Sequence, residues 1–222
     1  MIMDSVEKLE SAFASLAGEY SFRKKLAEKS VREWRWATFT WFDLRPLYFE
    51  RAGYAPGRRL RQAPANRYGR AYYGLDEEER ITVERDFNEF GFYETFYNWA
   101  SDPVEVAHFD YSPDKKPINL MIVRRVENRP ISSSTAAINS YIHEDYQWDG
   151  ELVSHVVRRV APREHGSLQD LRHWYTAEAT YGNKGVILRV ELHWPPAPPE
   201  RTDPIVEVMF ERRGNRIYRR HC

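Results

Sequence analysis

A repeated pattern between about Gly69 and Trp194 constrains the fold of this chain more than any other feature. Aromatic-rich extended residues are followed by a short polar turn and then by a β-branched run. The fullest copy runs from Ser140 to Arg159 and reads SYIHEDYQWDGELVSHVVRR. Asp149-Gly150 separates its two halves, and an Asp-Gly pair between two such runs is typical of a hairpin turn. The pattern therefore predicts successive β-hairpins.

Counting these units predicts about nine to eleven strands in mostly antiparallel order. We expect a mainly β (α+β) fold, in which a large antiparallel meander forms a curved sheet, a sandwich or a partly open barrel. The chain has 222 residues, which lies within the range of about 200–250 residues for one such domain. Residues 1–54 would form a helical preface with the first aromatic strands, 55–70 an arginine-rich loop, and 69–222 the meander.

The first part of the chain changes its period near Trp34. Apolar residues at three- and four-residue steps predict an amphipathic helix that begins near Asp4 or Ser5, and a second helix is expected from about Ser21 to Trp34. Residues 34–49 form the densest aromatic block and suggest one or two strands broken at Pro46. The serine-rich stretch from Ile131 to Thr135 is interpreted as a loop.

Two further expectations concern the surface of the sheet. Thr82 and Glu84 alternate with apolar residues, which favours one solvent-exposed face. Charges on the sheet would protect its edges from pairing with other chains. The residues expected to do so are Arg124, Arg125, Arg158 and Arg159.

Composition limits the possible partners. Lys and Arg together number 33, as do Asp and Glu, so the whole chain has no bias toward nucleic acid or anionic lipid. The N-terminus carries acids where a signal peptide carries positive charge, and no apolar run reaches the roughly 18 residues of a membrane span. We expect a cytoplasmic protein without membrane association. The single cysteine, Cys222, excludes an internal disulfide and a cysteine metal cluster, and no cofactor is expected.

The segment 55–70, APGRRLRQAPANRYGR, contains five arginines and no acid. Arginines can pair with the carboxylates of an acidic protein partner, or can contact phosphates and bases of a single strand. The segment could equally be a solvated linker between the helices and the sheet. A protein partner is favoured over nucleic acid because the whole chain is neutral. The candidate binding residues here are Arg58, Arg59, Arg61, Arg67 and Tyr68.

No motif assigns a reaction, since the chain lacks G-x-S-x-G, a glycine-rich phosphate loop and H-E-x-x-H. If the protein is an enzyme, the candidate catalytic residues are His143, Asp145 and His155, which could converge on one hairpin. His143 and Asp145 share a strand face, whereas His155 faces His143 only if the register suits. Their spacing matches no recognised metal site.

The stretch from Tyr146 to Leu152 resembles the YD repeat of Rhs-type proteins, in which an aromatic strand meets an Asp/Gly turn and a returning Leu. Trp148 stands where that family would have its second tyrosine. The resemblance implies a β-sheet shell and carries over no catalytic residue.

Two classes of function fit these patterns. The first is a non-catalytic binding protein that holds a protein partner on a sheet face, such as an immunity protein, an inhibitor or an adaptor. The second is a small-molecule binder or enzyme with an aromatic pocket inside a half-open barrel. Nucleic-acid binding through the arginine loop is a further alternative. The aromatic residues expected at the binding surface or pocket are Trp36, Trp41, Tyr97, Trp99, Tyr146 and Trp148.

Overall fold

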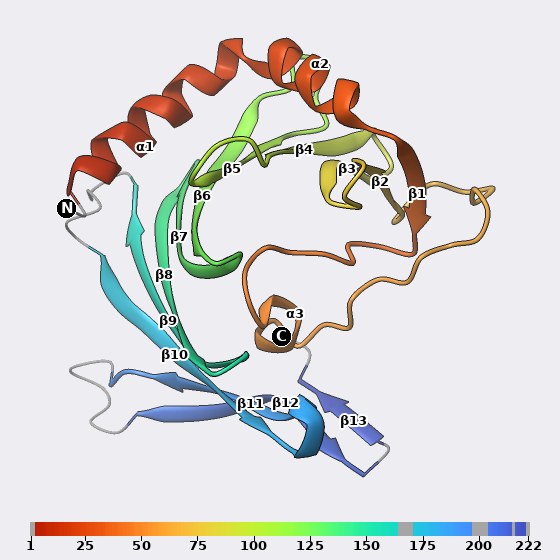
Figure 1. Cartoon of the computed structure of the whole chain (residues 1–222). Coiled ribbons are helices and arrows are strands. Elements are labelled where there is room, and N and C mark those ends of the chain that lie inside the picture. The colour runs from red at the N-terminus through yellow and green to blue at the C-terminus, as the bar shows by residue number, and fades with distance from the viewer. Residues whose placement is uncertain (1–2, 164–170, 197–203, 215, 221–222) are drawn as a thin grey trace.

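The computed structural model describes residues 3–163, 171–196, 204–214 and 216–220. Its dominant feature is one antiparallel sheet in which 13 strands follow one another in chain order. Each strand pairs with the next along the chain, and β1 and β13 remain as the two edges. Figure 1 shows that the sheet is strongly curved and open on one side. The predicted antiparallel meander, with an N-terminal helical segment, is confirmed.

The helices are α1 (Met3–Ser15), α2 (Tyr20–Ser30) and the short α3 (Tyr48–Arg51), with 3-10 turns at Leu16–Gly18 and Asn183–Gly185. The first strands are β1 (Glu33–Ala37), β2 (Ala71–Leu75), β3 (Ile81–Phe87), β4 (Phe92–Asn98), β5 (Val104–Phe109) and β6 (Pro117–Val126). The remaining strands are β7 (Arg129–Ala137), β8 (Ser140–Asp149), β9 (Leu152–Pro162), β10 (Arg172–Tyr181), β11 (Ile187–Trp194), β12 (Ile205–Arg213) and β13 (Arg216–Arg219).

The hairpin predicted from Asp149-Gly150 joins β8 to β9. Asp149 pairs with Leu152, and Gly150 has a positive φ of 57°, which glycine adopts without steric cost. A bulge between Gln147 and Trp148 shifts the register, so that Trp148 pairs with Val153. Both of these residues consequently lie on the inner, concave face of the sheet, where they join a buried apolar cluster.

The helices α1 and α2 cover the convex face (Figure 1). They pack over β3, β4, β6 and β7, where Leu9, Phe13 and Leu16 are buried against Phe109 and other apolar side chains. The amphipathic spacing of the first helix is thus satisfied by burial of one face. The second helix ends at Ser30, not at Trp34, because Val31 is extended and Trp34 belongs to β1.

The expectation of strands across residues 34–49 is wrong beyond Ala37. Residues 38–47, here called the inner strap, run across the concave face and lead into α3. Trp41, Phe42 and Leu44 pack against the inner side of the sheet. Burial of these large side chains, and not ladder pairing, fixes this segment.

Other local expectations are also wrong. Ile131–Thr135 is no loop but lies within β7, which pairs with β6 and β8. Thr82 and Glu84 are buried, not solvated. The four arginines expected at edges lie on β6 and β9, which are paired on both sides. These differences share one cause. Local sequence patterns suggested surface positions, but the strand order makes these strands central and the inner strap covers part of the concave face.

Among the described residues, no helix is long and apolar enough to cross a membrane. Cys222 lies outside the described residues.

Candidate functional site

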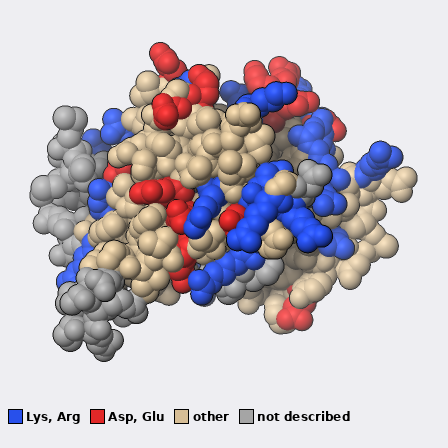
Figure 2. All heavy atoms as spheres, turned by 90° about the horizontal axis from the view of Figure 1, so that it is seen from below, with Lys and Arg blue, Asp and Glu red and all other residues tan. Residues whose placement is uncertain are grey.

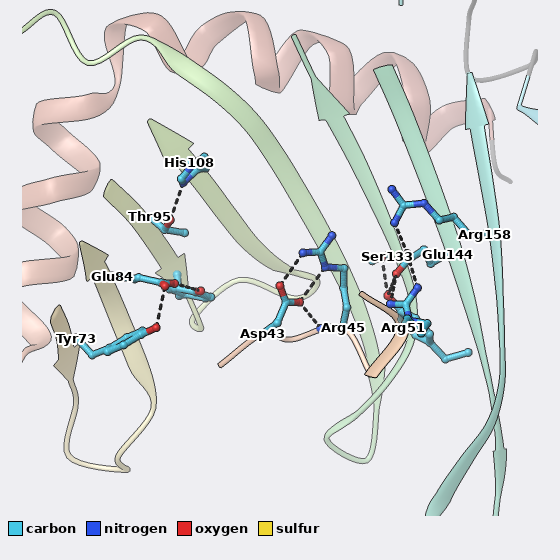
Figure 3. Close-up of polar contacts among 12 residues, drawn as sticks. Asp43, Arg45, Arg51, Tyr73, Glu84, Thr95, His108, Ser133, Glu144 and Arg158 are labelled. Atoms are coloured by element: carbon cyan, nitrogen blue, oxygen red, sulfur yellow. Dashed lines mark hydrogen bonds and ion pairs between the residues drawn. The ribbon is translucent and has the colours of Figure 1, made fainter. Parts of the chain in front are cut away.

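A cavity of about 290 Å³ lies between the inner strap and the concave face of β3 to β8. The strap supplies one wall, including Phe42 and Leu44, and the sheet supplies the other, including Val106 and Met121. Its charged and imidazole side chains are Asp43, Arg45, Glu84, Asp86 and His108. Figure 3 shows most of these groups along the concave face.

Glu84 lies on β3 and points inward, because the preceding Val83 packs beneath the helices and side chains alternate along a strand. The hydroxyl of Tyr73 donates to Oε1 of Glu84 at 2.8 Å, and the hydroxyl of Tyr97 donates to Oε2 at 3.0 Å. The hydroxyl of Tyr73 in turn accepts a hydrogen bond from the backbone N–H of Trp41 at 2.9 Å. Figure 3 shows the contact between Tyr73 and Glu84. Through Tyr73 the carboxyl of Glu84 is therefore connected to the strap.

Burial raises the pKa of Glu84 to about 7. The two tyrosine hydrogen bonds act in the opposite direction, and the nearby carboxyls of Asp86 and Asp43 raise the pKa further. Among the described residues, Glu84 forms no ion pair that would offset the cost of burying this charge. Glu84 can consequently gain or lose a proton near neutral pH.

Asp86 and His108 complete this end of the cavity. Asp86 follows Glu84 by two residues on the same face of β3, and burial raises its pKa. Oγ1 of Thr95 lies 2.7 Å from Nδ1 of His108. Burial lowers the pKa of His108 to about 4, against a smaller opposing effect of Asp110, so its imidazole is neutral at pH 7.

The strap contributes an ion pair of its own. Nε and Nη2 of Arg45 lie 2.8 and 2.6 Å from the two carboxylate oxygens of Asp43. The guanidinium also lies over the ring of Tyr48, 4.3 Å from its centroid. This bidentate contact neutralises Arg45 locally. The cavity wall as a whole is therefore acidic, since Glu84 and Asp86 have no cationic partner among the described residues.

A second polar cluster surrounds Glu144 on β8. Nη1 and Nη2 of Arg51, from α3, lie 2.9 and 3.2 Å from the two carboxylate oxygens, and Nη1 of Arg158 lies 2.8 Å from Oε1. The hydroxyl of Tyr146 donates to Oε2 at 2.9 Å. Burial alone would raise the pKa of Glu144, but the charge of Arg51 and its neighbours lowers it to about 2. This carboxylate anchors α3 to the sheet (Figure 3).

The histidines considered as catalytic candidates lie on the convex face. Nε2 of His143 is 3.1 Å from Oδ1 of Asp145, and Asp145 also pairs with Arg159. The register places Arg159, not His155, opposite His143. His155 instead lies opposite Gln147, with its Nε2 3.8 Å from Glu178. The sheet therefore does not bring the three candidates into one site.

A serine hydroxyl joins this group, since Oγ of Ser134 on β7 lies 2.9 Å from Nδ1 of His143. Backbone N–H groups or side-chain donors stabilise the developing oxyanion in a hydrolytic site. Here β7 and β8 are each paired on both sides, so their N–H groups are used in the ladders. Ser134, His143 and Asp145 thus form a hydrogen-bonded polar group on the convex face.

The six aromatic candidates are divided among different places. Tyr97 lines the cavity, whereas Trp41 and Trp99 line a neighbouring hollow of about 440 Å³. Trp36 stacks on Tyr72 with centroids 4.3 Å apart. The remaining two, Tyr146 and Trp148, pack in the apolar cluster of the C-terminal strands.

The arginine loop is exposed, and Tyr68 has 62% of its surface accessible. Arg59 lies over the ring of Trp41 at 4.1 Å, and Arg67 over that of Trp36 at 5.5 Å. Within the described part of the chain, Arg58, Arg59, Arg61 and Arg67 form no ion pair with a carboxylate. Figure 2 shows that basic side chains gather on one part of the lower face of the molecule.

Sequence reasoning missed Glu84, Asp86 and the strap pair Asp43 and Arg45 as site residues. One signal was present, because Asp43-Leu44-Arg45 places two opposite charges within the densest aromatic block. Charged groups surrounded by large apolar residues are normally buried as pairs.

No family model, curated protein or solved structure matches this chain.

Proposed function

We propose that this protein binds a small organic molecule in the cavity between the inner strap and the sheet. The observation that carries the proposal is the environment of Glu84. Buried charges are normally paired with an opposite charge, whereas Glu84 is held only by two tyrosine hydroxyls at the wall of a cavity. Ionisable groups with perturbed pKa values in a concave site are typical of functional sites.

The dimensions and the lining support this proposal. Ligand pockets usually span about 300–1,000 Å³ and combine an apolar lining with a few polar groups. The volume of about 290 Å³ suits a ligand at the small end of that range. Leu44, Val106 and Met121 supply apolar surface, and Glu84 and His108 supply polar contacts. Because Glu84 titrates near neutral pH, it can also exchange a proton with a bound molecule.

A fragment screen by protein-observed NMR tests the proposal. Ala137 lines the cavity, and the replacement Ala137→Leu would fill part of it. We expect fragments that bind the native protein to lose binding in Ala137→Leu and to keep it in His155→Gln, a matched change on the convex face. The proposal fails if the Ala137→Leu variant has a native melting temperature and every fragment still binds.

The arginine loop supports a second candidate function, the binding of an acidic protein partner. Its four exposed arginines form no ion pair with a carboxylate among the described residues, and arginine is favoured in interfaces. An inhibitor, immunity protein or adaptor would use such a surface. Replacing Arg58, Arg59 and Arg61 by Ser should weaken capture of the partner from cell extract without lowering the melting temperature.

The matched control removes the same charge elsewhere. Lys8, Lys25 and Lys29 are exposed on α1 and α2, and their replacement by Ser should leave capture unchanged. Equal capture by the loop variant and the native protein would exclude the loop from the interface. Loss of the captured material after nuclease treatment would indicate nucleic acid instead of a protein partner.

A further inference from the structure

We infer that the ligand of the strap cavity is an organic cation, an amine whose charged nitrogen lies beside Glu84 and Asp86. This inference rests on the proposed function and names the chemical class of its ligand. It depends on which charges of the cavity wall are already paired and which are not.

The ionisable groups of the wall divide into paired and unpaired sets. Asp43 and Arg45 neutralise each other through a bidentate contact of 2.8 and 2.6 Å. His108 is neutral, with Nδ1 engaged by Thr95. Glu84 and Asp86 remain, and neither carboxyl forms an ion pair with a cation among the described residues. The cavity thus presents two carboxyls without a counter-charge.

Geometry places these two carboxyls together. Glu84 and Asp86 occupy alternate positions of β3, so both side chains project from the same face of the strand, roughly 7 Å apart along it. An ammonium group between them could interact with both. Each oxygen of Glu84 accepts one tyrosine hydrogen bond, and a carboxylate oxygen has capacity for a second.

Ligands of other charge fit the wall less well. An anion would be brought next to two carboxyls in a partly desolvated site, where like charges repel strongly. Arg45 cannot compensate, because its guanidinium is already held by Asp43. A neutral ligand would leave the charge of Glu84 without a partner. A cation supplies the missing counter-charge.

The rest of the lining suits the hydrocarbon part of such a molecule. Phe42 and Tyr97 lie edge to face with centroids 6.0 Å apart, and both line the cavity. Aromatic rings attract cations, and the adjacent Val106, Met121 and Ile142 provide apolar contact. The wall therefore matches an amine with a small apolar or aromatic body.

Matched probes test this inference. Benzylamine, benzyl alcohol and benzoate share one body and differ in charge. Their affinities for the native protein are measured by NMR titration at pH 8, where Glu84 is ionised. We expect benzylamine to bind at least about tenfold more tightly than the other two. Equal or tighter binding of benzyl alcohol or benzoate would overturn the inference.

Substitutions of the two carboxyls test whether they cause the preference for benzylamine. Glu84→Gln and Asp86→Asn should each weaken benzylamine binding by about tenfold and leave benzyl alcohol unchanged. Glu178→Gln, on the convex face, serves as the control and should change neither. If Glu84→Gln does not fold, Asp86→Asn alone decides. Unchanged benzylamine affinity in the folded variants contradicts the inference.

Failure of the inference and failure of the proposed function have different signatures. If uncharged or acidic fragments lose binding in Ala137→Leu while amines do not bind, the cavity binds ligands but the assignment of an amine is wrong. If no fragment of any charge is sensitive to Ala137→Leu, the proposed function itself is wrong.

Discussion

Glu84 and Glu144 lie on the same concave face and are both buried, yet their surroundings are opposite. Each accepts at least one hydrogen bond from a tyrosine hydroxyl. Only Glu144 also contacts guanidinium groups, those of Arg51 and Arg158. The pKa of Glu144 is accordingly lowered to about 2, whereas burial raises that of Glu84 to about 7. The presence of a cation, not burial or tyrosine contact, separates the two.

This difference corresponds to two roles. Glu144 holds Arg51 and thus fixes α3, where the inner strap ends. Glu84 lies at the cavity wall and is linked by hydrogen bonds to the strap through Tyr73. The paired carboxylate supports the wall of the cavity, and the unpaired one remains available to a ligand.

Breaking the paired site should have the largest effect. Glu144→Gln leaves the guanidinium groups of Arg51 and Arg158 without their carboxylate in a buried position. Removing one member of a buried ion pair costs about 3–5 kcal/mol of unfolding free energy. Urea denaturation at pH 7 measures this loss.

An exposed ion pair provides the control for that experiment. Arg129 and Glu151 form a pair in which the glutamate is largely exposed, so Glu151→Gln should cost less than about 1 kcal/mol. Equal stability losses in the two variants would show that the Glu144 cluster is not a buried anchor.

Glu84, the unpaired carboxyl, should make the free energy of unfolding decrease as the pH rises. The pKa of Glu84 is about 7 in the folded state and has an ordinary value of 4.5. The folded state therefore binds the proton more tightly. Its stabilising contribution is fully present below pH 4.5 and is lost as the pH rises through 7. The loss amounts to about 3 kcal/mol. Glu84→Gln removes this pH-dependent contribution. The stability of the variant relative to that of the native protein should therefore rise between pH 5 and pH 8.

The measured quantity is the difference in unfolding free energy between Glu84→Gln and the native protein. This difference is needed because His108 makes the stability of both proteins increase with pH. Its pKa is lowered from 6.5 to about 4, so its contribution is present above pH 6.5 and lost as the pH falls through 4. Urea denaturation of both proteins at pH 5 and pH 8 cancels this effect. A constant difference across that range would contradict the raised pKa of Glu84.

The two carboxylates also show which features could be predicted from sequence. Hairpins such as Asp149-Gly150 and the apolar spacing of α1 are local, and both are confirmed. Glu84 was expected on a solvated face because alternation reports two faces without saying which one curvature encloses. The strap was missed for a related reason, since its aromatic residues are fixed by long-range packing against the sheet.

The strand register that separates the histidine candidates could not be predicted from the sequence either. The bulge at Gln147 and Trp148 and the pairing of His143 with Arg159 depend on the alignment of whole strands. Residue spacing within a single hairpin does not determine that alignment. The sequence therefore predicts the class of fold, and the site depends on contacts between segments distant in the chain.

Removing one hydrogen bond to Glu84 tests how the tyrosine hydroxyls affect its pKa. Tyr97→Phe keeps the ring and removes one hydrogen bond of 3.0 Å, which stabilises the ionised carboxylate. The pKa of Glu84 should rise above its native value, by the equivalent of roughly 1 kcal/mol. Carbon-detected NMR titration of the glutamate carboxyl groups measures this change. Tyr73→Phe is the less suitable variant, because it also removes the acceptor of the Trp41 N–H.

The smallest effect is expected on the convex face. His143→Gln alters a largely buried polar group on the convex face, whose hydrogen-bond partners are Ser134 and Asp145. The amide of the replacement can keep one of these two hydrogen bonds. Loss of the other hydrogen bond should lower the unfolding free energy by about 1 kcal/mol or less. Fragment affinities for the cavity should also remain unchanged, because the side chain of His143 points away from the concave face. A loss of stability above about 2 kcal/mol would contradict the small expected effect, and a loss of fragment binding would contradict the assignment of the site to the concave face.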